Sequence, residues 1–299
     1  MRGVAMQQLS ACEVLVDCRL DLSEGPAWHA AEGALYWVSI LDGVVHRYHL
    51  SSGEHRTWEV GQMVGAVVVR ESGGMMLAIR DGFATLDTVS GMTTLVAEVE
   101  STDAGQRMND GKCDARGRFW AGTMSASTPV PGSGTLYRLD ADRTVTPMLG
   151  GVTISNGLGW SPDNRTMYFI DTPTGRVDAF DFDLASGTID NRRGCAQVTR
   201  GEASPDGMAV DAEGCLWVAV WGVGEVRRYS PDGRHCATLR TPLPAPSSCA
   251  FGGSGLDTLM ITTARLGLTP EQCAEFPHSG SILAADVGVV GLPVATCAA

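Results

Sequence analysis

The sequence contains no long apolar run and no cluster of basic residues, and each absence excludes a class of partner. No apolar stretch approaches the roughly 18 residues that a membrane-spanning helix needs. The formal net charge is −12 at pH 7, and an acidic chain without a Lys/Arg patch is repelled by nucleic acid and by anionic membranes. We therefore expect no nucleic-acid partner and no membrane partner.

The beginning of the chain lacks the features of a secretion signal. Residues 1–16, MRGVAMQQLSACEVLV, contain neither a long apolar core nor a small-residue cleavage site, and we expect residues 1–10 to be a flexible N-terminus. The nine cysteines are odd in number and scattered, without a CxxC pair, which is typical of reduced thiols in a cytoplasmic protein. Several of them, such as Cys215 within GCLWVAV, fit a small core residue.

Glycine and apolar residues, in contrast, are abundant. The 299 residues are 44% hydrophobic and 19% charged, which is sufficient for a large buried core and too apolar for disorder. Glycine occupies 37 positions, well above the roughly 7% average, and indicates many turns. The length allows two ordinary domains or one large all-β or α/β domain.

A turn followed by an apolar strand recurs six times along the chain. The copies are EGALYWVSI (32–40), SGGMMLAIR (72–80), RGRFWAGTM (116–124), PDNRTMYFID (162–171), EGCLWVAV (213–220) and GLDTLMITT (255–263). Aligned on the anchor residues Tyr36, Met76, Trp120, Tyr168, Trp217 and Met260, they are separated by 40, 44, 48, 49 and 43 residues. Each copy is followed by a second pattern, a glycine-containing turn and an alternating strand, such as DGVVHRYHLSSG (42–53).

Six units of 40–50 residues with several short strands each predict an all-β fold, a six-bladed β-propeller of four-stranded antiparallel blades. One such domain would span residues 1–299. The strand CEVLVDCR (12–19) is expected to join the last blade (281–290), which closes the ring and hides two sheet edges. A degenerate seventh blade is the alternative, and helical spacing is found only near residues 269–274.

Four polar residues lie at nearly the same distance before an anchor. Glu24, Asn109, Asn156 and Asp206 precede their anchors by 12, 11, 12 and 11 residues. Because equivalent positions in the innermost strands meet near the propeller axis, we expect the four side chains to gather at one mouth of the channel. The other two blades carry Val64–Gly65 and Ser248–Cys249 at this position, so the ring of polar groups is lopsided.

Facing carboxylate and amide oxygens favour a divalent cation with a preference for oxygen ligands. The six histidines (29, 46, 49, 55, 235 and 278) are scattered and are expected to have structural or surface roles, which argues against a dedicated zinc site. An alternative stays open, because Asn109, Asn156 and Asp206 are each followed by Asp or Gly and could each form a plain turn. Glu24 is not a turn former.

The segments SEGPAW, RMNDGKCDARGRFWAGTM, SNGLGWSPDNRTMYFIDT and PDGMAVDAEGCLWVAVWG resemble the senescence marker protein (regucalcin)/gluconolactonase family. This resemblance implies a propeller with one divalent metal ion (Ca²⁺, Zn²⁺, Mn²⁺, Mg²⁺ or Fe²⁺) and hydrolysis of sugar lactones. It implies that Glu24, Asn156 and Asp206 bind the metal, that Arg107 and Asn109 bind the substrate, and that Asp206 is the catalytic base. The neutral loop 125–134, SASTPVPGSG, departs from relatives that carry acidic residues there.

The resulting hypothesis is a cytoplasmic sugar lactonase, a gluconolactonase-like carboxylic ester hydrolase of carbohydrate metabolism (EC 3.1.1). It would act on a small-molecule lactone as a monomer or weak homo-oligomer. The chain lacks G-x-S-x-G and needs no serine nucleophile, and Asp110 is expected to support a turn. The alternatives are a metal-dependent phosphotriesterase or arylesterase, and a calcium-binding or protein-interaction propeller without catalytic activity.

Overall fold

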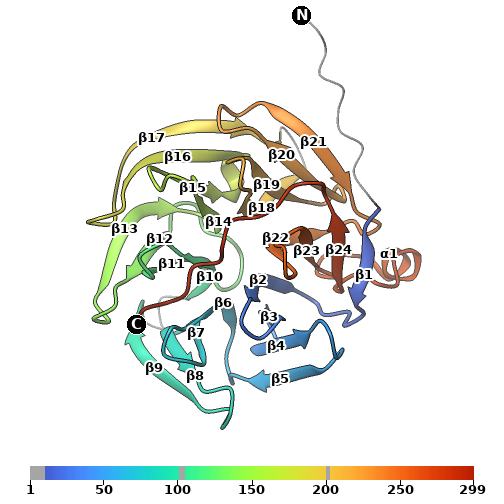
Figure 1. Ribbon diagram of the computed structural model, residues 1–299, viewed down its shortest axis with the longest axis horizontal. Coiled ribbons are helices and arrows are strands. Elements are labelled where there is room, and N and C mark those ends of the chain that lie inside the picture. Colours follow the sequence, from blue (N-terminus) through green and yellow to red (C-terminus); the bar gives the residue numbers. More distant parts are fainter. Residues whose placement is uncertain (1–10, 101–104, 200–202) are drawn as a thin grey trace, which may run out of the picture.

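The computed structural model describes residues 11–100, 105–199 and 203–299. They form six four-stranded antiparallel sheets, arranged as blades around a central channel (Figure 1). The predicted six-bladed propeller is therefore confirmed, and the alternative of a seventh blade is wrong for the described residues. The prediction for residues 1–10 lies outside them.

The blades follow one another along the chain, each running from an innermost to an outermost strand. The first three blades are β2 (Ser23–His29), β3 (Ala34–Ser39), β4 (Val44–His49) and β5 (His55–Glu59); β6 (Val64–Val69), β7 (Met75–Ile79), β8 (Gly82–Leu86) and β9 (Thr93–Glu98); and β10 (Gln106–Cys113), β11 (Phe119–Ser125), β12 (Gly134–Leu139) and β13 (Val145–Val152). Blades four and five are β14 (Ser155–Trp160), β15 (Thr166–Asp171), β16 (Arg176–Asp183) and β17 (Thr188–Gln197); and β18 (Ser204–Val210), β19 (Leu216–Trp221), β20 (Glu225–Tyr229) and β21 (His235–Arg240).

Blade six closes the ring with strands from both ends of the chain. It contains β22 (Pro246–Gly252), β23 (Thr258–Thr263), β24 (Ile282–Asp286) and, outermost, β1 (Glu13–Val16). Val14 pairs with Leu283 in antiparallel register, as the sequence predicted for the N-terminal strand. The N-terminal strand covers the outer edge of β24, and the chain then continues into blade one, so both ends of the chain belong to one closed ring.

Apolar side chains pack between neighbouring blades. All six predicted anchors lie in second strands and are buried; they are Tyr36, Met76, Trp120, Tyr168, Trp217 and Met260. Six buried clusters occur, one at each interface between adjacent blades. At the interface of blades five and six, for example, the rings of Trp217 and Phe251 meet edge to face, with centroids 6.2 Å apart.

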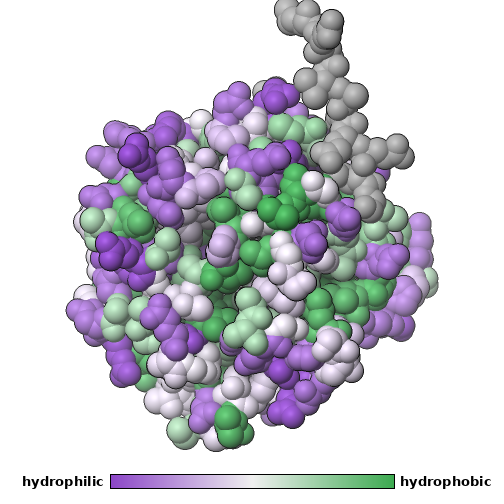
Figure 2. Space-filling view, viewed as in Figure 1, coloured by the Kyte–Doolittle hydropathy of each residue, from purple (hydrophilic) through white to green (hydrophobic). Residues whose placement is uncertain are grey.

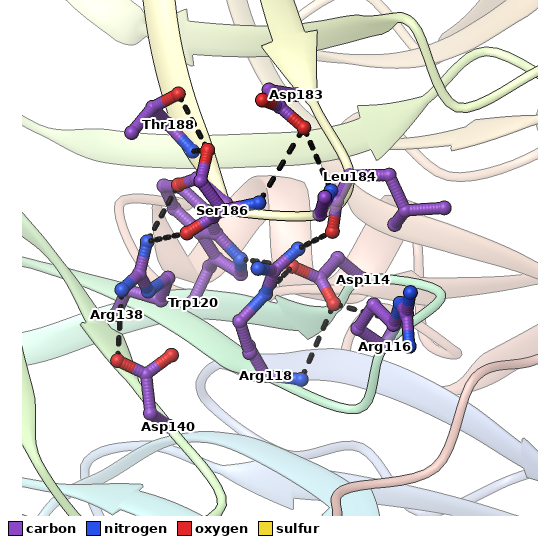
Figure 3. A network of polar contacts seen from close by, with 12 residues as sticks. Asp114, Arg116, Arg118, Trp120, Arg138, Asp140, Asp183, Leu184, Ser186 and Thr188 are labelled. Carbon is purple, nitrogen blue, oxygen red and sulfur yellow. Dashed lines mark hydrogen bonds and ion pairs between the residues drawn. The ribbon is translucent and has the colours of Figure 1, made fainter.

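A buried carboxylate follows the innermost strand in blade three and holds the start of the next strand (Figure 3). The Oδ1 atom of Asp114 accepts from the backbone N–H groups of Arg116 and Arg118, at 2.9 and 3.2 Å. Its Oδ2 accepts from Arg118 Nε at 2.6 Å and from Trp120 Nε1 at 2.9 Å. The anchor Trp120 is thus hydrogen-bonded as well as packed.

Blade five repeats this arrangement around Asp211. Its Oδ1 accepts from the N–H groups of Glu213 and Cys215, and its Oδ2 from Trp217 Nε1 at 2.9 Å and Arg228 Nε at 2.8 Å. Both carboxylates are fully buried, and both receive four hydrogen bonds that include one from an arginine. Pairing of this kind is what makes burial of a charge tolerable.

The C-terminal segment crosses the face where the innermost strands end. In Figure 1 it passes across the centre of the ring, and it is held by isolated bridges of Gly291 to Asp211 and of Cys297 to Arg70. The α-helix of the described part, α1 (Pro270–Glu275), coincides with the predicted helical turn. Across the described ranges, no helix is long and apolar enough to cross a membrane, and all nine cysteines, which lie in these ranges, are free thiols.

Candidate functional site at the channel mouth

The innermost strand of every blade contains a one-residue β-bulge in its pairing with the second strand. The bulges lie at equivalent positions, one to three residues before the residue that pairs with the anchor. The pairing register shifts between Glu24 and Ala27, Val64 and Ala66, Met108 and Gly111, Asn156 and Leu158, Pro205 and Met208, and Pro246 and Ser248. A bulge leaves a residue out of the ladder and turns its side chain to a new direction, which is why bulges are frequent next to binding sites.

The register also defines which residues are equivalent around the axis. The partners of the six anchors are Ala27, Val68, Lys112, Gly159, Ala209 and Ala250. Three residues before each partner stand Glu24, Gly65, Asn109, Asn156, Asp206 and Ser247. The predicted equivalence of the four polar residues is therefore correct. In blade six the equivalent is Ser247, whereas the sequence alignment placed Ser248 there.

These residues lie in strands, so the alternative that they form plain turns is wrong. Asn109 belongs to β10, Asn156 to β14 and Asp206 to β18. The glycines that follow several of them are required by close approach of adjacent strands instead. A Cβ added to Gly207 would overlap the Ser248 hydroxyl, and one added to Gly157 would lie 2.8 Å from the carbonyl oxygen of Asp206. At Gly65, the equivalent position in blade two, a Cβ would overlap the carbonyl oxygen of Asn109.

A chain of hydrogen bonds links blades three, four and five at the mouth. Arg107 Nη1 donates to Asn109 Oδ1 at 2.7 Å, and Asn109 Nδ2 donates to Asn156 Oδ1 at 3.0 Å. Asn156 Nδ2 in turn donates to the Thr172 hydroxyl at 2.8 Å, which donates to the carbonyl oxygen of Pro205 at 2.9 Å. The amide orientations of both asparagines are thereby fixed, and the last bond reaches the residue before Asp206.

The carboxylates at the mouth are buried without a paired cation. Glu24 and Asp206 are 5% and 7% exposed, and within the described ranges neither they nor Asp110 form an ion pair within 4.0 Å. Burial, followed by the charges of Asp206 and Asp110, raises the pKa of Glu24 well above its usual value. Burial and the charge of Asp110 likewise raise the pKa of Asp206.

Arg107 is a cation whose charge acts on both Glu24 and Asp206. Its burial lowers its pKa to about 10, while the charges of Glu24 and Asp206 act in the opposite direction. Among the described residues its Nε and Nη2 groups make no hydrogen bond, since only Nη1 is used, toward Asn109 and the carbonyl oxygen of Met108. The guanidinium therefore retains donors for a ligand.

The oxygen atoms fit a divalent cation. Among the described residues, Glu24 Oε2 accepts only from the backbone N–H of Gly25, at 2.8 Å, and Asn156 Oδ1 accepts one hydrogen bond and keeps a second lone pair. In the described ranges, no three His, Cys, Asp or Glu side chains gather into a cation site. A cation at the mouth would therefore be held by two carboxylates and an amide oxygen, a donor set suited to Ca²⁺, Mg²⁺ or Mn²⁺.

Sequence reasoning missed three residues of this region. Asp110 does support its own backbone, accepting from the Gly111 N–H at 2.7 Å, but its charge also acts on Glu24 and Asp206. Thr172 directly follows β15, the second strand of blade four. A polar residue at the end of this strand could have indicated from the sequence that Thr172 belongs to the mouth. Lys112 contacts a strand across the channel, for which spacing in the sequence gives no signal.

The neutral loop 125–134 borders this mouth. Ser125 pairs with Gln106, next to Arg107 in β10, and Gln106 Nε2 donates to the carbonyl oxygen of Ser133 at 3.1 Å. Residues 127–132 are exposed. Both ends of the loop thus contact Gln106, the neighbour of Arg107, whose Nε and Nη2 groups are available for a ligand.

The fold and the mouth together define a class of protein, a six-bladed propeller with a buried acidic and amide cluster at one end of its channel. A family model described as the SMP-30/Gluconolactonase/LRE-like region matches residues 22–265. The chain belongs to this family.

Three relatives illustrate the similarity. Regucalcin from Gallus gallus is 36% identical over 290 residues, which are 94% of this chain and 97% of the relative. A calcium-binding protein, regucalcin, from Agrobacterium tumefaciens str. C58 has a solved structure with a TM-score of 0.92 and 30% identity, covering 97% of this chain and 98% of that one. A luciferin-regenerating enzyme has a TM-score of 0.89 and 29% identity, covering 96% and 99%.

Proposed function

We propose that the protein is a metal-dependent hydrolase that opens a sugar lactone to its aldonic acid. The observation that carries the proposal is the pair of buried carboxylates, Glu24 and Asp206, which form no ion pair within the described ranges and which are both acted on by the charge of Arg107. Membership of a family whose name includes gluconolactonase supports the lactone as substrate.

Glu24, Asn156 and Asp206 would hold the divalent cation. When bound, the cation polarises a carbonyl group and stabilises negative charge on its oxygen. The buried carboxylates lose mutual repulsion on cation binding, and the hydrogen bond from Asn109 keeps the Asn156 amide turned with its oxygen available.

Arg107 and Asn109 would bind the sugar. The free Nε and Nη2 donors of Arg107 suit the hydroxyl groups of a polyol or the carboxylate of the product. Asn109 contributes mainly by orientation, because its Nδ2 is already bound to Ser155 O at 2.7 Å and to Asn156. The exposed loop 127–132 would contact the outer part of the ligand.

Asp206 would orient the attacking water and accept its proton. In the metal-free protein, burial raises the pKa of Asp206 above its usual value. Water adds to the lactone carbonyl carbon, the ring C–O bond breaks, and the ring oxygen leaves as a hydroxyl group after taking up a proton. The net products are the aldonate and one proton.

A proton-release assay tests this proposal. Metal-free protein is assayed against a panel of aldonolactones, with Ca²⁺, Mg²⁺, Mn²⁺, Zn²⁺ and Fe²⁺ added in turn, and against a phosphotriester. We expect lactone turnover that chelation abolishes and a divalent cation restores. Cation binding without turnover of any lactone would favour the calcium-binding propeller instead, and turnover of the phosphotriester alone would favour the phosphotriesterase.

Two variants separate the proposed roles. Asp206→Ala should abolish turnover, whereas Arg107→Ala should mainly raise KM, because it removes substrate binding without removing the base. Full activity of the Asp206 variant would contradict the assignment.

A further inference from the structure

We propose that the interior of the channel, between the mouth and the C-terminal segment, is a second binding site, which takes a small, mainly apolar carboxylate. Its lining reaches Gly25 and Asp110 on the side of the mouth. The site is a cavity between the innermost strands and the C-terminal segment. It goes beyond the proposed lactone hydrolysis and does not depend on it.

The cavity has a volume of about 350 Å³. Its walls include Trp28, Val69, Trp160 and Phe251, and residues 292–295 of the C-terminal segment complete its lining. Figure 2, which looks onto this face, shows hydrophobic residues gathered around its centre. The volume is about twice that of the ~150 Å³ cavity that admits benzene, and it falls at the lower end of ligand pockets.

One cationic side chain lines the cavity. Lys112 is the only lysine among the 22 basic residues of the chain, and it stands at a register position where the other five blades have Gly, Ala or Val. Its Nζ donates to the carbonyl oxygen of Met208 at 2.6 Å, so the ammonium group reaches from blade three to blade five. Two of its three N–H donors remain for a ligand.

Two further donors in the lining lack acceptors. The Nε1 atoms of Trp28 and Trp160 are buried and have no hydrogen-bond partner among the described residues. The two indoles occupy equivalent positions in blades one and four, one residue after Ala27 and Gly159, and are 3% and 7% exposed. Buried donors without acceptors are unfavourable, and an occupant that carries acceptor oxygens relieves them.

These observations define the chemistry of the occupant. The walls are mainly apolar, so water is a poor filling, and the ammonium group and the two indole N–H groups are available donors. Asp110 and Ser248 also line the cavity; Asp110 accepts from the Gly111 N–H, and the charge of Lys112 acts on it. A short alkyl or aromatic group with one carboxylate matches the apolar walls and the donors together.

Calorimetric titration of the full-length protein tests the site, with octanoate and 1-naphthoate as carboxylate probes and 1-octanol as the neutral control. We expect wild-type protein to bind octanoate more tightly than octanol. Lys112→Met should weaken octanoate at least ~10-fold, because charge-assisted hydrogen bonds are lost, and should leave octanol unchanged. Val294→Glu, which adds a negative charge in the C-terminal part of the lining, should act in the same direction and serves if the lysine variant does not fold.

A variant that fills part of the cavity tests whether the probes bind there. Ala250→Leu reduces the cavity and should weaken both probes, while Ala30→Leu, at an exposed turn of blade one, should change neither. Removal of divalent cations should leave octanoate binding intact, which separates this site from the mouth. Absence of octanoate binding, equal binding by wild type and Lys112→Met, indifference to Ala250→Leu, or loss of binding on chelation would each overturn the proposal.

Discussion

Buried carboxylates lie at both ends of the innermost strands, and the two ends differ in what neutralises them. Asp114 and Asp211, where the strands end, each receive four hydrogen bonds, including one from an arginine and one from an anchor tryptophan. Glu24 and Asp206, at the mouth, have no ion pair within 4.0 Å in the described ranges.

The difference separates carboxylates that stabilise the fold from carboxylates that are free to bind a ligand. A buried charge with four donors holds two strands together, and removing it leaves an indole N–H and a guanidinium N–H without their acceptor. A buried charge without a cation is unfavourable by itself, so its retention points to an external partner. The mouth is also where all six innermost strands bulge, and where Gly65 and Gly207 leave no room for a Cβ atom.

The largest effect is expected from Asp211→Asn. Arg228 keeps its ion pair with Glu213, but an amide NH2 group in place of Oδ2 can accept from neither Trp217 Nε1 nor Arg228 Nε. Two buried donors lose their acceptor, which should lower the free energy of unfolding by about 3–5 kcal/mol, measured by urea titration. Asp181→Asn removes a carboxylate from an exposed pair with Arg193 and should leave the midpoint almost unchanged. Turnover per folded molecule should stay at the wild-type level in both variants. If Asp211→Asn and Asp181→Asn were equally stable, the buried carboxylate would not have the structural role that the comparison gives it.

Gly65→Ala should lower the free energy of unfolding by less, and it should also disturb the residues of the mouth. The added Cβ overlaps the carbonyl oxygen of Asn109, so β10 must shift, at a cost of about 1–3 kcal/mol. Because Asn109 moves, KM for the lactone should rise as well. Gly150→Ala, which meets open space, is the matched control; a Gly65 variant that behaves like it would show that the mouth tolerates displacement.

Thr172→Val should have the smallest effect of the three substitutions. It should weaken cation binding and leave the free energy of unfolding nearly unchanged. It removes the hydroxyl that fixes Asn156 and contacts Pro205, and loss of such a supporting hydrogen bond lowers cation affinity by about 10-fold. Calorimetric titration with Ca²⁺ and Mn²⁺ measures this directly. Thr172→Ser keeps the hydroxyl and should bind as wild type does; a Ser variant as weak as the Val variant would assign the effect to packing.

The repeat of apolar anchors was sufficient to predict the blades, the closing strand and the register of the four polar residues. It placed blade six one residue off, because the β22–β23 hairpin is longer: Ala250 and its partner Met260 are ten residues apart, whereas Ala209 and Trp217 are eight apart. Counting back from an anchor cannot detect a change in hairpin length.

Contacts across the channel could not be predicted from spacing. Lys112 and Met208 are 96 residues apart in the sequence, and their pairing depends on the curvature of the whole ring. The bulges of blades three, four and five were also invisible, because the residues that form them, Asp or Asn followed by Gly, have the composition of turns. Only the pairing register distinguishes a bulge within a strand from a turn between two strands.

The most direct test of the account is the change in melting temperature of metal-free protein as a divalent cation is added. A cation that binds only the folded state raises Tm progressively with its concentration. We predict this rise for wild type with Ca²⁺ or Mn²⁺, and no rise for Asp206→Asn, whose metal-free Tm should equal or exceed that of wild type because a repelling charge has been removed. The same rise in both proteins would contradict the claim that the unpaired carboxylates of the mouth hold a cation.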